Sequence, residues 1–406
     1  MTLTVGTGKT RKEHNTSYTD NTMRVDGVLI LNTLQCTNKL IITDLTNSFV
    51  QMVRSMVDSK EDGPVFLRTV AWEDGSLVLI DQTKLPNMLT YVRLDDYKQV
   101  ASAIKNLVVR GAPAIGVTAA FGLALAAIHS NSRILEELIS DLNAAQAILR
   151  STRPTAVNLF WALERVMKIA REQKNVADVK NATLEEALKM SEEDIQVNKQ
   201  MGINGADLIE DGDVILTHCN AGSLATVGYG TALGVIRAAD EAGKHISVVA
   251  TETRPVMQGS RLTAFELQHD GIDVSLIPDT AVGHVMSRQM IKRVIVGADR
   301  VLRTGHVFNK IGTYQVALIA NQHKIPFYVA APLSTFDFES NPADIVIEER
   351  PIEEVTEIAG TRIVPLGVRV FNPAFDLTPP ELISGIITEK GVLRPPFEKN
   401  LKILLG

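Results

Sequence analysis

The fold is decided by residues 211–239, which read DGDVILTHCNAGSLATVGYGTALGVIRAA. The apolar, β-branched run at 213–218 follows Asp-Gly, as expected of a buried strand. Cys219 comes directly after this run, and a glycine-rich loop then leads into a helical pattern over 231–239. Ligands of open α/β sheets bind beyond the carboxyl ends of the strands. This order of elements therefore predicts an active site around Cys219.

The C-terminal half continues with alternating strands and helices. This alternation is typical of a doubly wound parallel sheet, so we expect an α/β, Rossmann-like domain. Its helices are predicted near 231–239, 259–269, 280–291 and 309–323. Its strands are predicted at 214–218, 246–251, 274–277, 294–298, 327–331 and 345–348.

The segment before it predicts a smaller domain with an antiparallel sheet and a helical bundle. Residues 66–92 alternate on both sides of Asp74-Gly75, a strong hairpin signal. From Asp96 the hydrophobic period becomes helical, and Pro154 and the capping residues 181–183 mark expected helix starts. The helices are predicted over 97–109, 113–129, 132–149, 155–173 and 184–204.

A chain of 406 residues is longer than a single hydrophobic core usually accommodates, which suggests more than one domain. We expect residues 1–64 to be an N-terminal extension, partly disordered because residues 1–21 are polar. Residues 65–205 would form the small sheet and helical domain. Residues 206–406 would form the Rossmann-like catalytic domain.

The amino-acid composition indicates which cellular compartment and which classes of partner we expect for this protein. Hydrophobic residues make up 45% of the chain and charged residues 22%, as in soluble globular proteins. A net charge of −6 argues against a nucleic-acid partner. Two cysteines leave no disulfide framework and fit a reducing cytoplasm. The apolar run 112–128 is interrupted by glycine and threonine and falls short of the roughly 20 residues of a membrane span, which favours a buried helix.

The first candidate site is Arg110, followed by Gly111, Ala112 and Pro113 at a helix start. Free N–H groups at such a start can bind an anion. Arg153 before Pro154 repeats the arrangement. Taken alone, each arginine is more often an ordinary surface residue at a helix start than a phosphate ligand.

A second candidate, Gly228-Tyr229-Gly230 with Gly234, is similar to a dinucleotide fingerprint because Glu252 ends the following strand. The loop is too long and the glycine spacing is wrong. A nicotinamide dehydrogenase is therefore disfavoured.

The third candidate is the pair Cys219 and Asp299. Each follows a predicted strand, and two strands of one parallel sheet could bring both side chains to one cleft. The ordinary alternatives are an inert packing cysteine and a capping aspartate.

Motifs of other enzyme classes do not occur. The sequence contains no HExxH, GxSxG or GxxxxGK[ST], and its histidines are scattered. These observations argue against a zinc enzyme, a serine hydrolase and a P-loop kinase. We expect no metal and no cofactor.

Several motifs together carry a resemblance that covers residues 67–392. The chain resembles the family of S-methyl-5-thioribose-1-phosphate isomerases, enzymes of methionine salvage within the initiation-factor 2B superfamily. The matching motifs are RGAPAIG (110–116), THCNAGSLAT (217–226), GYGTALGVIRAA (228–239), TETRPVMQGSRLTAFEL (251–267), GADRV (297–301), NKIGTY (309–314), PFYVAAPLSTFD (326–337) and NPAFDLTPPELI (372–383).

The resemblance implies a homodimeric aldose–ketose isomerase that acts on a sugar phosphate without a cofactor. It implies that Cys219 and Asp299 are catalytic. The substrate-binding residues that it implies are Arg110, Gly111, Ala112, Arg153, Gln258, Asn309 and Lys310. Asp299 would protonate the ring oxygen of the substrate. Cys219 would either remove the C2 proton as a thiolate or stabilise a direct hydride shift.

Three alternatives stay open. An isomerase of ribose 1,5-bisphosphate would need basic residues around C5, whereas a methylthio substrate needs an apolar pocket there. A related isomerase could take 5-deoxyribose 1-phosphate. A non-catalytic regulatory subunit of the superfamily would typically lack the Cys219–Asp299 pair.

Overall fold

The computed structural model describes residues 66–153 and 156–405. Pro64–Gly406 forms one compact unit. The predicted N-terminal extension and the predicted role of Pro154 at a helix start lie outside the described residues.

A small antiparallel sheet begins the described chain. Its strands β1 (Val70–Glu73), β2 (Ser76–Ile80) and β3 (Tyr91–Leu94) lie in that order. Asp74 and Gly75 have φ of 49° and 82°, the left-handed values that a tight two-residue turn requires. The predicted hairpin is confirmed.

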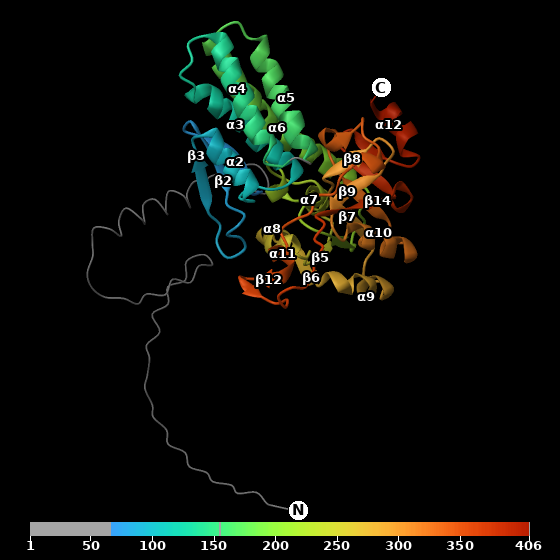
Figure 1. Ribbon diagram of the computed structural model, residues 1–406. Coiled ribbons are helices and arrows are strands. Elements are labelled where there is room, and N and C mark those ends of the chain that lie inside the picture. The colour runs from blue at the N-terminus through green and yellow to red at the C-terminus, as the bar shows by residue number, and fades with distance from the viewer. Residues whose placement is uncertain (1–65, 154–155, 406) are drawn as a thin grey trace, which may run out of the picture. The chain divides into compact units, whose positions relative to one another are not determined.

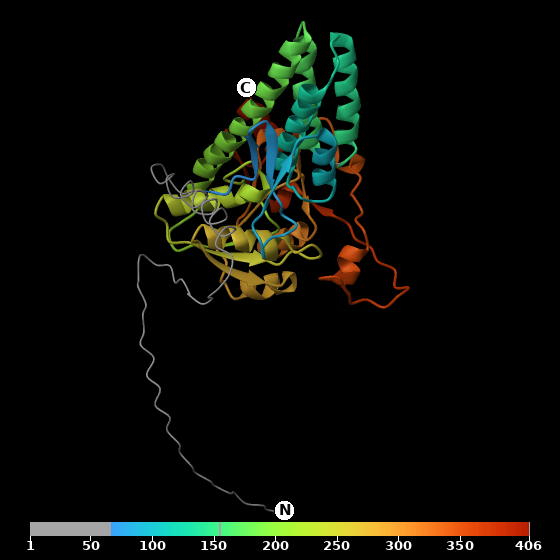
Figure 2. The same cartoon turned by 90° about the vertical axis from the view of Figure 1, so that its left-hand side faces the viewer.

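The helices that follow build the first core, and each predicted helix is present. Helix α3 lies among the other helices in both views (Figure 1 and Figure 2) and supplies more buried side chains to this core than any of the other four helices. By length and composition α3 could cross a membrane, but 89% of it is buried inside the fold, as predicted for a core helix. The helices are α2 (Tyr97–Lys105), α3 (Ala112–His129), α4 (Leu135–Arg150), α5 (Val157–Glu172) and α6 (Val176–Ala206).

The predicted start of α6 is wrong. The helix begins eight residues before the expected 184, and the side chain of Asn175 caps it by accepting from the backbone N–H of Asp178 at 2.9 Å. Thr183 instead lies inside the helix, where its hydroxyl donates to the carbonyl of Val179 at 2.9 Å. The extra turns carry α6 over 31 residues, from the helical part to the large sheet.

A seven-stranded sheet organises the C-terminal part. Its order is β16-β15-β10-β7-β4-β5-β6, and every pairing is parallel except β15 with β16. This confirms the predicted parallel-sheet architecture. The strands are β4 (Val214–Thr217), β5 (Ser247–Thr251), β6 (Asp273–Ile277), β7 (Arg293–Val296), β10 (Phe327–Ala330), β15 (Gly385–Thr388) and β16 (Gly391–Leu393).

The strand predicted at residues 345–348 is wrong. The position beside β10 belongs to β15, whose GIIT sequence is buried throughout. Residues 345–348 form no strand, and the run ends in charged residues, with Glu348 paired to Arg350 at 3.1 Å. A buried segment without charged residues gains more from a position inside the sheet than a segment that must keep its charges near solvent.

Helices cover both faces of this sheet. Strand residues alternate between the two cores: Ile215 and Ile295 pack on the side of α7 (Ala232–Glu241), whereas Leu216 and Val294 pack on the opposite side. That opposite side is covered by α9 (Val282–Ser287), α10 (Thr313–Gln322) and α12 (Phe397–Leu405). Helix α8 (Ala264–His269) packs beside β6.

The strand order reverses between β4 and β7. From β4 the chain builds β5 and β6 on one side, then returns to build β7, β10 and β15 on the other. At such a switch point the loops after neighbouring strands diverge and leave a crevice. Cys219 follows β4 and Asp299 follows β7, so both lie at this crevice.

A second, four-stranded sheet lies beyond β7, in the order β11-β8-β9-β14. The predicted helix start at 309 is wrong, because Asn309 and Lys310 end strand β9 and the helix begins at Thr313. The strands are β8 (Arg300–Leu302), β9 (Val307–Lys310), β11 (Phe336–Asp337) and β14 (Phe375–Thr378), and the remaining elements include α11 (Glu353–Thr356), β12 (Glu357–Ile358) and β13 (Thr361–Arg362).

Candidate active site

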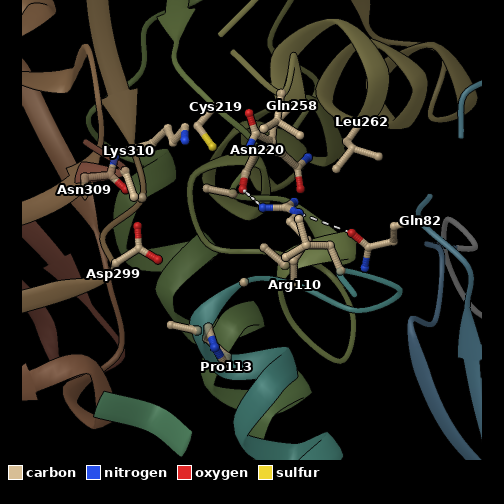
Figure 3. A pocket seen from close by; sticks show the side chains of 18 of the residues that line it. Gln82, Arg110, Pro113, Cys219, Asn220, Gln258, Leu262, Asp299, Asn309 and Lys310 are labelled. Atoms are coloured by element: carbon tan, nitrogen blue, oxygen red, sulfur yellow. Dashed lines mark hydrogen bonds between the residues drawn. The ribbon is translucent and has the colours of Figure 1, made fainter. Parts of the chain in front are cut away.

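A cavity of about 390 Å³ lies over the switch point. Its walls come from the N-terminal helical part and from both C-terminal sheets (Figure 3). All the site residues predicted from the sequence line this one cavity: Arg110, Gly111, Ala112, Arg153, Cys219, Gln258, Asp299, Asn309 and Lys310.

Cys219 is held by its backbone. Its φ of 64° lies in the left-handed region, which is uncommon for a residue with a side chain and frequent at functional sites. The backbone N–H donates to the hydroxyl of Thr253 at 2.9 Å, and the carbonyl accepts from the hydroxyl of Thr263 at 2.7 Å. These two bonds fix the direction in which the thiol enters the cavity.

The surroundings of Cys219 keep it protonated. Burial raises the pKa of the Cys219 thiol, and the carboxyl of Asp299 adds to this shift. The cations of Arg110 and Lys310 oppose it without reversing it. A thiol rather than a thiolate therefore faces the cavity at neutral pH.

Asp299 sits on the other side of the same space (Figure 3). Its backbone N–H donates to the carbonyl of Phe308 at 3.0 Å, which ties the end of β7 to strand β9. Burial raises the pKa of the Asp299 carboxyl against the opposing effects of Arg153, Lys310 and Arg110. The environment thus favours the neutral acid, the form that can donate a proton.

Arg110 is fixed above the crevice. Its Nε donates to Gln82 Oε1 at 3.2 Å, and its Nη1 donates to the carbonyl of Asn220 at 2.9 Å (Figure 3). Its buried Nη2 has no hydrogen-bond partner among the described residues. A buried, unpaired guanidinium N–H beside a cavity is suited to an anionic ligand.

Gly111 is required by the close approach of two loops. It precedes α3 with φ of 94°, and a Cβ at this position would lie 2.4 Å from the Cα of Ala225. Because Gly111 has no side chain, the start of α3 can reach the cavity. Pro113 lies in the first turn of this helix. The predicted helix start with proline in its first turn is confirmed, and anion binding by this segment stays a prediction.

Other polar atoms also lack partners in the described part of the chain. Gln258 Oε1 and Arg153 Nε are buried without a hydrogen bond there. Arg153 Nη2 lies 3.6 Å from a carboxylate oxygen of Glu348. Asn309 Nδ2 donates to the hydroxyl of Thr313 at 3.0 Å, which orients the amide at the end of β9. A polar ligand in the cavity would satisfy the unpaired atoms.

Glu266 is a supporting residue that the sequence pattern did not single out. Its fully buried carboxylate accepts from the backbone N–H of Ser223 at 2.7 Å, from Asn220 Nδ2 at 2.8 Å and from Arg237 Nη2 at 2.8 Å. These bonds fix the loop that follows Cys219. The local sequence gave no signal, because the partners lie more than twenty residues away from Glu266.

His218 has a structural role. Its Nε2 donates to the carbonyl of Ile311 at 2.9 Å, so its Nδ1 accepts from the hydroxyl of Thr251 at 2.7 Å. Burial lowers the pKa of the imidazole, which keeps it neutral. No group of three or more His, Cys, Asp or Glu side chains suited to a metal ion occurs within residues 66–153 and 156–405.

Comparison with known proteins identifies the family. The model of the initiation factor 2 subunit family matches residues 108–395. The chain belongs to this family. It is 55% identical over 340 residues to the methylthioribose-1-phosphate isomerase of Thermotoga neapolitana, which covers 84% of this chain and 98% of the relative.

Solved structures of the initiation factor 2 subunit family share the fold. The 5-methylthioribose 1-phosphate isomerase of Pyrococcus horikoshii superposes with a TM-score of 0.78 at 47% identity, over 83% of this chain and 95% of its own. A structure from A. fulgidus, described as the delta subunit of translation initiation factor eIF-2B, superposes with a TM-score of 0.76 at 54% identity. The match covers 84% of this chain and 99% of that structure. A curated relative from Archaeoglobus fulgidus is also 54% identical and is named a putative methylthioribose-1-phosphate isomerase.

Proposed function

We propose that the chain isomerises S-methyl-5-thio-α-D-ribose 1-phosphate to S-methyl-5-thio-D-ribulose 1-phosphate in methionine salvage. The observation that carries the proposal is the pairing of a protonated thiol, Cys219, with a raised-pKa carboxyl, Asp299, in one cavity at the switch point. The relatives named above support the same substrate.

The substrate cannot open spontaneously, because phosphate occupies its anomeric oxygen. In our proposal Asp299 donates a proton to the ring oxygen while the C1–O4 bond breaks and its electron pair goes to that oxygen. A hydride then moves from C2 to C1. The C2 hydroxyl loses its proton to the Asp299 carboxylate and becomes the ketone. Atoms and charges balance, and no external oxidant is needed.

Cys219 lies beside the reacting carbons in this proposal. Its raised pKa favours a neutral thiol that shields the developing cation from water over a thiolate that removes the C2 proton. Arg110, Arg153 and Lys310 would hold the phosphate. Gln258, Asn309 and the backbone of Gly111 and Ala112 would bind the remaining oxygens.

A direct assay tests the proposal. Purified protein is incubated with methylthioribose 1-phosphate, 5-deoxyribose 1-phosphate or ribose 1,5-bisphosphate, and the ketose is quantified. We expect the highest kcat/KM with the methylthio substrate. Faster turnover of the bisphosphate would favour the alternative isomerase. Complete absence of turnover in folded protein would favour a regulatory subunit.

We further propose a cytoplasmic homodimer. The near absence of cysteine fits a reducing compartment, and the family resemblance implies paired copies. Analytical ultracentrifugation of the whole chain tests this assembly, and a single species of monomer mass would contradict it.

A further inference from the structure

A chain of four buried hydrogen bonds starts at the backbone of Cys219. The N–H of Cys219 donates to Thr253 Oγ1 at 2.9 Å, and the hydroxyl oxygens of Thr253 and Thr251 lie 3.2 Å apart. Thr251 Oγ1 lies 2.7 Å from His218 Nδ1, and His218 Nε2 donates to the carbonyl of Ile311 at 2.9 Å. We propose that Thr253 is a positioning residue, which holds the Cys219 thiol in place for the reaction through this hydrogen-bond chain. The inference rests on the proposed function and extends it to residues that do not touch the substrate.

Each proton in the hydrogen-bond chain has one place. A carbonyl oxygen only accepts, so His218 Nε2 carries the proton that binds Ile311, and Nδ1 of the neutral ring accepts from Thr251. Thr251 has then used its single proton and can only accept from Thr253. Thr253 Oγ1 is left with lone pairs for the N–H of Cys219. No other arrangement of protons around the neutral ring satisfies all four bonds.

The backbone conformations at both ends of the first bond need such support. Cys219 and Thr253 have φ of 64° and 63°, and for a β-branched residue such as threonine this left-handed value is an outlier. Strained conformations persist only where surrounding contacts impose them, and they gather at functional sites. The carboxylate of Asp279 imposes the conformation of Thr253, because it accepts from the backbone N–H of Thr253 at 2.8 Å and of Arg254 at 2.6 Å. Thr253 is thus fixed independently and can in turn fix Cys219.

Close packing leaves the hydrogen-bond chain little freedom to rearrange. The side chains of Thr251, Thr253 and His218 are 1%, 0% and 2% exposed. Two glycines let neighbouring backbone approach: a Cβ at Gly259 would lie 1.7 Å from the carbonyl oxygen of Thr251, and one at Gly312 would lie 3.0 Å from the ring of His218. A buried donor that loses its partner in such packing stays unpaired, which is costly.

The far end of the hydrogen-bond chain reaches a second wall of the active site. Ile311 directly follows Lys310, which lines the same cavity as Cys219 (Figure 3). The chain therefore ties the ends of β4, β5 and β9 together, although these strands are far apart in the sequence. Cys219 acts on the transition state in the proposed function, whereas the phosphate ligands bind substrate and transition state alike. A displaced thiol should lower kcat and leave KM nearly unchanged.

Substitution Thr253→Val tests the proposal, because it removes the hydroxyl and keeps the branched shape. With methylthioribose 1-phosphate, kcat should fall by about tenfold to a hundredfold, since a misplacement of about 1 Å can cost a factor of this size. KM should stay within about twofold of the wild-type value. Thr253→Ser keeps the hydroxyl and should restore kcat to near the wild-type value. Steady-state kinetics of the purified full-length variants measure both constants.

The matched control is Thr335→Val. Thr335 is also 0% exposed, its hydroxyl donates to Asn158 Oδ1 at 3.3 Å, and it does not line the cavity. The control loses one buried hydrogen bond in the same way and should keep the wild-type kcat and KM. An equal loss of kcat in Thr335→Val would overturn the positioning role, as would a Thr253→Ser variant as slow as Thr253→Val.

Amide hydrogen exchange tests the same bond without any substrate. The N–H of Cys219 should exchange slowly in wild type and in Thr253→Ser, and faster in Thr253→Val, as measured by mass spectrometry of overlapping peptides that end near Cys219. Unchanged exchange in folded Thr253→Val would overturn the proposal. Failure of the proposed function has a different signature, since wild-type protein would then not turn over the substrate while the exchange pattern remained.

Thr251→Val keeps the proposal testable if Thr253→Val does not fold. This variant interrupts the hydrogen-bond chain one bond further from Cys219 and should also lower kcat at nearly unchanged KM. Wild-type kinetics in folded Thr251→Val would show that the chain does not position the thiol.

Discussion

Two side chains define the proposed chemistry at the scale of the residue. Cys219 and Asp299 should both be essential, because one shields the reacting carbons and the other supplies the proton. Asp299→Asn is expected to lower kcat by at least about a hundredfold, the scale of losing one acid or base, and Cys219→Ser is expected to lower kcat as well. Steady-state assays on purified variants with unchanged circular dichroism measure this loss. Near-normal turnover in either folded variant would remove that residue from the mechanism.

The pH profile reports the protonation of the same two groups. Burial raises the pKa of Asp299 and of Cys219, and a hydride-shift route needs both groups protonated. Raising the pH removes these protons, so kcat should fall along an alkaline limb. A rising acidic limb would indicate that the Cys219 thiolate is the active form.

Isotope exchange provides an independent check on that mechanism. In D₂O, a hydride shift transfers the C2 hydrogen within the substrate, so the product should contain no solvent deuterium at C1. Deuterium at C1, detected by mass spectrometry, would indicate an enol phosphate and proton removal by Cys219.

At the scale of the element, helix α6 supports the loop that carries the site. The half-buried Asp194 on α6 accepts from the backbone N–H of Val227 at 2.7 Å, within the loop that follows Cys219. Burial raises the pKa of Asp194 from 3.8 to about 7. Native protein therefore holds a proton that the unfolded chain releases, and the free energy of unfolding should fall as the pH rises through this range.

Asp194→Asn tests this linkage. The amide oxygen can still accept from Val227, but the side chain no longer titrates. Between pH 5 and pH 8 the variant should gain about 2–3 kcal/mol relative to wild type, since each pKa unit corresponds to about 1.4 kcal/mol. Urea denaturation at both pH values measures the difference. A pH-independent difference would show that Asp194 titrates normally.

At the scale of the whole molecule, we propose that the catalytic unit begins after the N-terminal extension. Pro64–Gly406 forms a compact unit of its own, and the curated relatives match 84% of the chain or slightly less. A chain that starts at Gly63 should therefore fold and keep its kcat/KM. Assay and thermal melting of the shortened and full chains compare them. A folded but inactive short chain would assign the extension a part in the site or in assembly.

The sequence by itself determined the local helices, strands and turns, and it placed the candidate site residues at the ends of these elements. The hairpin at Asp74-Gly75, the buried helix α3 and the strand before Cys219 follow from turn residues and hydrophobic period, which act over a few residues. The resemblance added the residues of the site. All of them line one cavity, although their catalytic and binding roles remain predictions.

Only the tertiary structure decided which distant segments complete the site. The reversal of strand order between β4 and β7, the choice of β15 over residues 345–348 and the contacts of Glu266 all depend on pairings between segments far apart in the chain. Local preference cannot select among such pairings, because their free energy comes from burial and hydrogen bonds that exist only after the chain has folded.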